Sequence, residues 1–213
     1  MTREIHYKMW QLAGPIIISN ISVPMLGAVD TAVMGHLPDA KYLGGVAVGA
    51  LVFTFIYWGF GFLRMGTGGL TAQAFGAEDA DEIRACLARA AVIGIPVALI
   101  LIILQAPIAW AAFSILEATT EVELLAEEYF YTRIWGAPAT LMNFALLGWF
   151  IGVQNTKAAL WHQLILNGVN IVLDLVFVIG FGWGVAGVAA ATAMADVAAV
   201  AFGLWLALPI LRR

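Results

Sequence analysis

The sequence predicts an all-α integral membrane protein, built as a bundle of six membrane-spanning helices. Hydrophobic residues make up 62% of the 213 residues, charged residues only 11%, and the mean hydropathy is +0.93. This composition is far from that of a soluble domain. The apolar runs are about 20 residues long, which is the length needed to cross a hydrocarbon core. They lack the short alternating pattern of a membrane β-barrel, so we expect helices.

Six apolar runs follow one another along the chain. The segments between them carry charge or turn-forming residues, for example GHLPDAKY, FGAEDADEIR and QNTKAA. The first run is too long for the core of a signal peptide and lacks a cleavage pattern, so we expect it to be a membrane span. The predicted spans cover residues 10–35, 44–70, 86–113, 126–153, 161–181 and 185–208.

The distribution of lysine and arginine predicts the orientation of these spans, because basic residues in short loops are held on the cytoplasmic side. One side of the bundle would carry seven such residues, and the other side only Lys41. The seven are Arg3, Lys8, Arg84, Arg89, Lys157, Arg212 and Arg213. Both termini are therefore expected in the cytoplasm. Arg64 and Arg133 lie toward the ends of two spans, where we expect their side chains to extend to the membrane surface.

Several other kinds of function are not indicated. The chain has no basic patch for nucleic acid. Its single cysteine, Cys86, excludes an intrachain disulfide and the usual thiolate metal sites. The glycine-rich stretch RMGTGGLTAQAFGA lacks the Gly-Lys-Ser/Thr of a phosphate loop. His6, His36 and His162 lie at or outside the predicted span edges without a protease motif, so we expect neither enzymatic activity nor an organic cofactor.

Three carboxylates interrupt the apolar spans, namely Asp30, Asp174 and Asp196. A charged aspartate at the bilayer centre costs about 2.5 to 3.5 kcal/mol on insertion scales, so residues of this kind are functional hypotheses by default. Thr192 stands one helical turn before Asp196 on the same face. An alternative interpretation is that these polar groups only hydrogen-bond one helix to another.

The fifth span carries a polar stripe. Its members, at spacings of four, three and four residues, are Gln163, Asn167, Asn170 and Asp174. These spacings place them within about 60° of one helix face. The stripe must face protein or a water-filled cavity, because lipid would leave its polar groups without partners. Oxygens of Asn170 and Asp174 suit a hard cation such as Na⁺, and a buried carboxylate suits a proton.

Two further patterns concern helix shape and packing. Pro15 and Pro24 remove backbone donors from the first span and are expected to bend it. Glycine pairs at four-residue spacing permit close approach of two helices. These pairs are Gly45 with Gly49, Gly148 with Gly152, and Gly180 with Gly184.

Four stretches of the sequence resemble the multidrug and toxic compound extrusion (MATE) transporters, specifically the DinF-type branch. They are PIIISNISVPMLGAVDTAVMGHLPDAKYLGGVAVGA, FLRMGTGGLTAQAFGA, NGVNIVLD and GVAGVAAATAMAD. The resemblance covers essentially the whole chain in order and spacing. Members of this family run to roughly twice this length, as two six-helix lobes related by internal symmetry. The resemblance therefore implies that residues 1–213 form a single N-terminal lobe, with the second lobe absent.

The resemblance also implies roles for individual residues. The cation site of the family falls by matching position on Asp30, Asn170, Asp174 and Thr192. These residues would hold the coupling ion, Na⁺ or H⁺. Pro15 matches the proline associated with bending of the first helix. Asp196 would serve as a proton relay, and Tyr129 would line the cavity beside Asn167 and Gln163.

Together, the residues and the resemblance predict a cation-coupled antiporter in the plasma membrane that exports amphiphilic, often cationic, organic compounds. Its partners would be the lipid bilayer, a small organic substrate and a second six-helix lobe. Two alternatives remain. A lipid-linked precursor flippase of the same superfamily would be expected to have a more basic cavity, whereas the charges inside the spans here are mostly acidic. A non-transporting scaffold, or a half-transporter that needs a second lobe, is the other. The sequence does not decide between Na⁺ and H⁺ or name the substrate.

Overall fold

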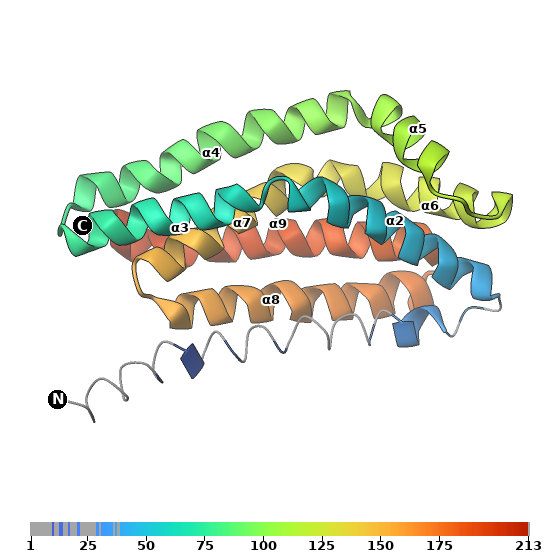
Figure 1. The fold of residues 1–213 in the computed structure, drawn as a ribbon. Helices are drawn as coiled ribbons and strands as arrows, with labels where there is room; N and C mark the ends of the chain where they lie inside the picture. Colours follow the sequence, from blue (N-terminus) through green and yellow to red (C-terminus); the bar gives the residue numbers. More distant parts are fainter. Residues whose placement is uncertain are drawn as a thin grey trace.

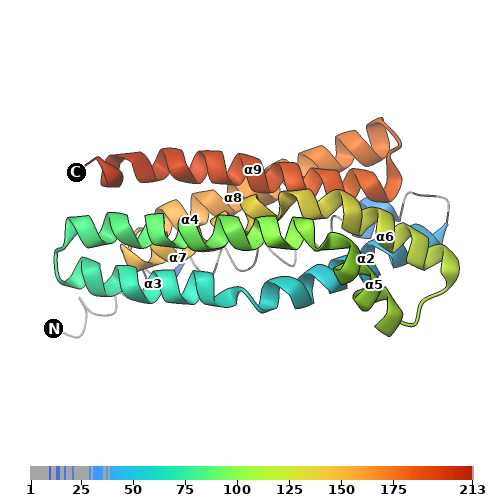
Figure 2. The same ribbon diagram turned by 90° about the horizontal axis from the view of Figure 1, so that it is seen from above.

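The computed structural model describes residues 39–212 without a gap, together with residues 10, 13, 14, 17, 21, 29, 31–35 and 37. Long helices, running side by side along one axis, make up the described part (Figures 1 and 2). Their bounds are α2 Ala40–Trp58, α3 Gly61–Gly76, α4 Ala80–Ile103, α5 Gln105–Ile115, α6 Thr120–Arg133, α7 Ala137–Gly152, α8 Thr156–Asp174 and α9 Gly184–Leu211. Two short segments complete the order, the 3₁₀ turn η1 (Ile134–Gly136) and the π-helical η2 (Leu175–Gly180).

Five helical stretches of the described chain are long and apolar enough to cross a membrane. They are Ala40–Gly76, Ala80–Ile103, Thr120–Gly152, Thr156–Gly180 and Gly184–Leu211. Each overlaps one of the second to sixth predicted spans. The predicted first span, residues 10–35, lies mostly outside the described residues. The prediction of an all-helical membrane protein is confirmed.

Several predicted spans are interrupted rather than continuous, and prolines explain two of the interruptions. Pro107 has no backbone N–H to donate to the carbonyl of Ile103, the residue at which α4 ends before α5 turns away (Figure 1). In the same way, Pro138 cannot donate to Ile134, and the 3₁₀ turn η1 separates α6 from α7 there. The second predicted span is divided between α2 and α3 next to Gly59.

The α3–α4 and α7–α8 connections are built in the same way. In each, the second residue after the helix adopts a left-handed conformation, with φ of 56° at Glu78 and 57° at Gln154. The next residue donates its N–H five residues back, at 3.0 Å for Asp79 and 2.9 Å for Asn155. Its side chain then accepts an N–H from the first turn of the following helix, at 2.9 and 3.1 Å respectively. This shared geometry produces two tight reversals at one end of the bundle.

Glycines set the closest helix contacts. A Cβ built at Gly45 or Gly49 of α2 would lie 2.5 Å from Leu125 or 2.6 Å from Tyr129 of α6. The second pair, on α7, packs equally closely on α3, because a Cβ at Gly152 would lie 2.6 Å from Thr71 and one at Gly148 would overlap the backbone of α3. The packing prediction is confirmed for these two pairs.

The prediction of close packing is wrong for the third glycine pair. The nearest atoms to a Cβ built at Gly180 or Gly184 lie 3.9 Å away, an ordinary contact distance. Gly184 instead supplies a backbone φ of 57° at the start of α9, in the left-handed region that glycine adopts without strain. The spacing of this pair therefore reflects the turn between η2 and α9, because Gly182, in the middle of the three residues that join them, also has a positive φ of 70°.

Candidate functional site

A cavity of about 410 Å³ lies between α2, α3, α6, α7, α8 and α9. Its polar lining consists of Tyr57, Arg64, Tyr129, Arg133, Thr140, Asn143, His162, Gln163, Asn167, Asn170, Thr192 and Asp196. A larger hollow of about 520 Å³, near the ends of α4 and α9, is lined mainly by apolar side chains and carries no charged residue. The smaller cavity is the candidate site, because polar and ionisable side chains inside membrane spans are energetically costly and usually mark a functional site.

One wall of the cavity is the polar stripe of α8, which faces the bundle interior as its spacing predicts. Asn167 and Asn170 are 5% and 1% exposed. The amide of Gln163 donates to Asn167 at 3.0 Å, and that of Asn170 donates to the Thr192 hydroxyl of α9 at 3.4 Å. Thr192 in turn donates to the backbone carbonyl of Val188 at 2.9 Å. The structure therefore brings together four of the predicted residues across the α8–α9 contact.

Asp174 is completely buried, one turn beyond Asn170 at the end of α8. The helix becomes π-helical at the next residue, Leu175. Single π-helical turns inside α-helices occur frequently at functional sites. The remaining residue of the predicted cation site, Asp30, and the predicted bend residues Pro15 and Pro24 lie outside the described residues. Binding of an ion between Asp30 and Asp174 therefore stays a prediction.

Asp196 belongs to a separate hydrogen-bonded group that faces α7. Its carboxylate accepts from the Thr140 hydroxyl at 2.6 Å and from the Asn143 amide at 3.0 Å. The same amide donates to the Asp196 backbone carbonyl, also at 3.0 Å. Asp196 is 5% exposed. Thr192 and Asp196 share one face of α9, yet one bonds to α8 and the other to α7.

His162 extends this group, which corrects its predicted place at a span edge. The residue is 1% exposed, and its Nε2 lies 3.0 Å from Asn143 Oδ1. Because the Asn143 amide nitrogen donates to Asp196, its oxygen must accept, and we assign the proton to His162 Nε2. Gly203 of α9 makes room for the ring, since a Cβ there would lie 2.8 Å from His162 Cδ2. The helix α8 begins at Thr156, five residues before the predicted span at 161, so hydropathy alone misplaces His162.

The opposite wall is aromatic and carries Arg133, which corrects the expectation that this side chain reaches the membrane surface. The guanidinium carbon lies 5.1 Å from the centre of the Phe53 ring and 5.9 Å from that of Tyr129. Its Nη1 donates to the Tyr129 hydroxyl at 3.2 Å. A guanidinium stacked on aromatic faces is partly compensated for the loss of water. Arg64 of α3 also borders the cavity, with its side chain exposed.

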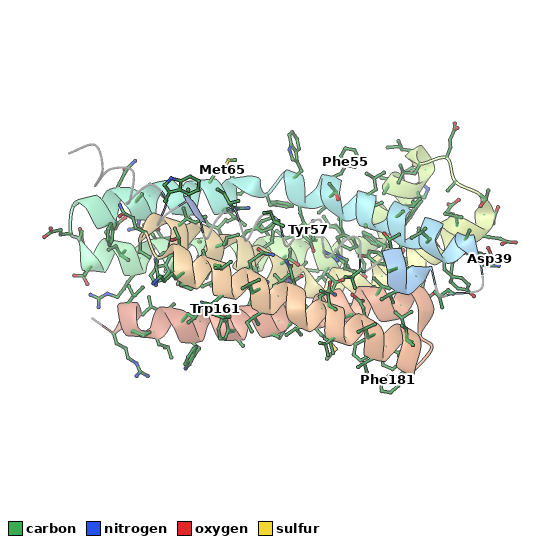
Figure 3. The ribbon with its side chains drawn as sticks, turned by 90° about the horizontal axis from the view of Figure 1, so that it is seen from below. Asp39, Phe55, Tyr57, Met65, Trp161 and Phe181 are labelled. Atoms are coloured by element: carbon green, nitrogen blue, oxygen red, sulfur yellow. The ribbon has the colours of Figure 1, made fainter. Side chains whose placement is uncertain are left out.

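Tyr129, predicted to line the cavity, does so and is 3% exposed. It packs directly on the backbone of α2 at Gly49, and this contact holds its hydroxyl beside Arg133. Tyr57 completes the wall, stacked on Phe53 with ring centres 5.5 Å apart. Figure 3 shows Tyr57 directed into the bundle, whereas Phe55 on the same helix points away from it. The period of α2 thus separates a membrane-facing side from a cavity-facing side.

Comparison with known proteins places this arrangement in a family. The MatE family model matches residues 15–176. The chain is 41% identical over 204 residues to DNA damage-inducible protein F of Escherichia coli (strain K12), covering 96% of this chain and 44% of that protein. It is 26% identical over 195 residues to the multidrug export protein MepA of Staphylococcus aureus (strain NCTC 8325 / PS 47), covering 91% and 43%.

Among solved structures, a MOP superfamily transporter from Pyrococcus furiosus has the same fold, with a TM-score of 0.83 at 24% identity. The match covers 94% of this chain and 43% of that one. The chain thus spans somewhat less than half the length of the relatives it matches. With its multi-pass helical architecture and a family model that matches more than half of its length, the chain belongs to the MATE family of membrane transporters.

Proposed function

We propose that the chain forms one lobe of a secondary antiporter that exports amphiphilic organic compounds, cationic ones among them, against an inward flux of Na⁺ or H⁺. The observation that carries this proposal is the buried polar contact between α8 and α9, at which Asn170 meets Thr192 one turn from the fully buried Asp174. In a MATE-family member, such oxygens inside the membrane are suited to a transported cation or proton.

Coupling would arise from the charge of the carboxylates. Binding of Na⁺ or a proton at Asp30 and Asp174 neutralises charge where the dielectric constant is low, so occupancy changes the energy of the conformation that holds the site. An ion can shift a two-state equilibrium only by its difference in affinity for the two states. We infer that the proline-bearing first span is the element that changes shape, and that Asp196 serves as a proton relay.

The orientation is also part of the proposal. Arg84, Arg89, Lys157 and Arg212 belong to the end of the bundle that holds the α3–α4 and α7–α8 connections and the end of α9 (Figure 1). At the other end of the described helices, Lys41 is paired with Glu121 at 3.1 Å. By the distribution of basic residues, the first end faces the cytoplasm in the plasma membrane.

A second six-helix lobe is the proposed partner, because the chain spans less than half of its relatives.

The test of the proposed function is ion-driven efflux of a fluorescent organic cation from proteoliposomes, with the chain alone and with a second lobe supplied. Asp174→Asn and Asp30→Asn should abolish efflux while leaving membrane insertion unchanged, because an amide cannot change charge. Asp81→Asn, at an exposed ion pair with Arg84, is the matched control. Normal efflux by either of the first two variants would overturn the proposal.

A further inference from the structure

Arg133 is a half-buried cation, and the described residues leave its guanidinium incompletely paired. Its only hydrogen bond to a described residue is the donation from Nη1 to Tyr129. The Nε atom is buried and has no hydrogen-bond partner. No ion pair within the part of the chain that the structure describes includes Arg133. A guanidinium has five N–H donors in a planar fork, and only one of them is bonded to a described residue.

The nearest candidate for a counter-charge in the cavity wall is already engaged elsewhere. Both oxygens of the Asp196 carboxylate accept hydrogen bonds from α7, one from Thr140 and one from Asn143. Asn143 is in turn held by His162. These contacts fix Asp196 against α7 instead of against Arg133. Among the described residues, the cavity therefore presents a cation on its aromatic wall that forms no ion pair with its acidic residue, Asp196.

We propose that Arg133 binds the anionic group of an amphiphilic ligand, a carboxylate in the simplest case, while the rings of Tyr57 and Phe144, which line the cavity, hold its apolar body. A planar guanidinium matches a carboxylate with two parallel hydrogen bonds. The rings of Tyr57 and Phe144 lie edge to face with centres 6.2 Å apart, and they offer an apolar surface to a flat group. The volume of about 410 Å³ is within the range of small-molecule pockets. This inference rests on the proposed transport function and adds compounds with an anionic group, zwitterions included, to its substrates.

The test compares two probes of nearly the same shape, 1-naphthaleneacetate and 1-naphthaleneacetamide. Binding of each to the full chain is measured by equilibrium dialysis in nanodiscs of zwitterionic lipid, and binding to empty discs is subtracted. We expect the unaltered chain to bind the carboxylate about tenfold more tightly than the amide, as a charge-assisted pair requires. Equal affinities for the two probes would overturn the proposal, and this comparison depends on no variant.

Substitutions then identify which residue causes the preference for the carboxylate probe. Arg133→Gln should abolish the carboxylate preference while changing the affinity for the amide less than twofold. Arg133→Lys should retain a weakened preference, because it keeps the charge without the planar fork. The control Arg84→Gln, outside the cavity, should bind like the unaltered chain. If Arg64→Gln abolishes the preference and Arg133→Gln does not, the assignment to Arg133 is wrong. Binding needs no ion gradient, so its failure is distinguishable from failure of coupled efflux.

Discussion

The two walls of the cavity differ in how their polar groups are stabilised. On the α7–α8–α9 side, side chains bond to one another across helices, as Asn143 does to Asp196 and His162. On the α2–α6 side, the charge of Arg133 rests on aromatic rings and a single hydroxyl. The first wall is a hydrogen-bond network between helices, and the second keeps donors of Arg133 unbonded among the described residues. A polar residue inside the bundle can therefore stabilise the fold or bind a ligand, depending on whether other side chains already satisfy its hydrogen bonds.

Removing the centre of the hydrogen-bond network should have the largest effect. Asn143→Leu leaves the Asp196 carboxylate and His162 Nε2 without a shared partner, so we expect a loss of about 3 kcal/mol in the free energy of unfolding. Cys86 is buried and is the only cysteine, so its labelling by a thiol-reactive dye during heating reports unfolding. The substitution Glu128→Gln, at a solvent-exposed residue of α6, is the control. If Asn143→Leu unfolds at the same temperature as the control variant, the network contributes little to the stability of the fold.

Gly49→Val should disturb the aromatic wall, because the Tyr129 ring packs directly on the backbone of α2 at Gly49. The new side chain would collide with the Tyr129 ring, and overpacking of this kind destabilises by about 2 kcal/mol. The same Cys86 labelling measures the change. Gly69→Val is the matched comparison on α3, because nothing lies within 4 Å of a Cβ there. An equal shift for both substitutions would indicate that loss of a glycine, rather than the contact with Tyr129, is responsible.

Tyr129→Phe sharpens the comparison because it keeps the ring on Gly49 and removes only the hydroxyl. Arg133 loses its acceptor, and we expect about 1 kcal/mol of destabilisation. In the dialysis experiment, the carboxylate preference should persist, since the guanidinium is still present. Loss of the preference in this variant would mean that the hydroxyl, and not Arg133, makes the decisive contact with the probe.

Gln163→Leu should have the smallest effect. Gln163 is half-buried at the margin of the stripe and donates one hydrogen bond, to Asn167. We expect a change within about 0.5 kcal/mol, as for a substitution away from any critical contact. The unfolding temperature from Cys86 labelling should match that of the unaltered chain. A shift as large as that of Asn143→Leu would place Gln163 in the structural network.

Much of the fold was predictable because the membrane restricts the choices. Apolar runs of spanning length in this solvent must be helices, and glycines at four-residue spacing on α2 and α7 indeed mark close contacts. The interruptions near Pro107 and Pro138 were not predicted from hydropathy, which does not register a missing backbone donor. For the candidate site, the spacing from Asn167 to Asp174 predicted one buried face. His162 and Arg133 were misplaced, because their burial depends on Gly203 and Phe53, which are distant in sequence.

The membrane environment, the helical class and the inward-facing stripe of α8 could all be predicted from the sequence, because each follows from composition or from spacing within one helix. Only the tertiary structure decided which helix supplies the partner for each polar group. Asp196 accepts hydrogen bonds from Thr140 and Asn143, whereas Thr192, one helical turn away, accepts one from Asn170. A hydrogen bond forms only where donor and acceptor lie within about 3 Å of each other. Between two helices, that distance depends on how the helices pack, which the sequence of either helix does not specify.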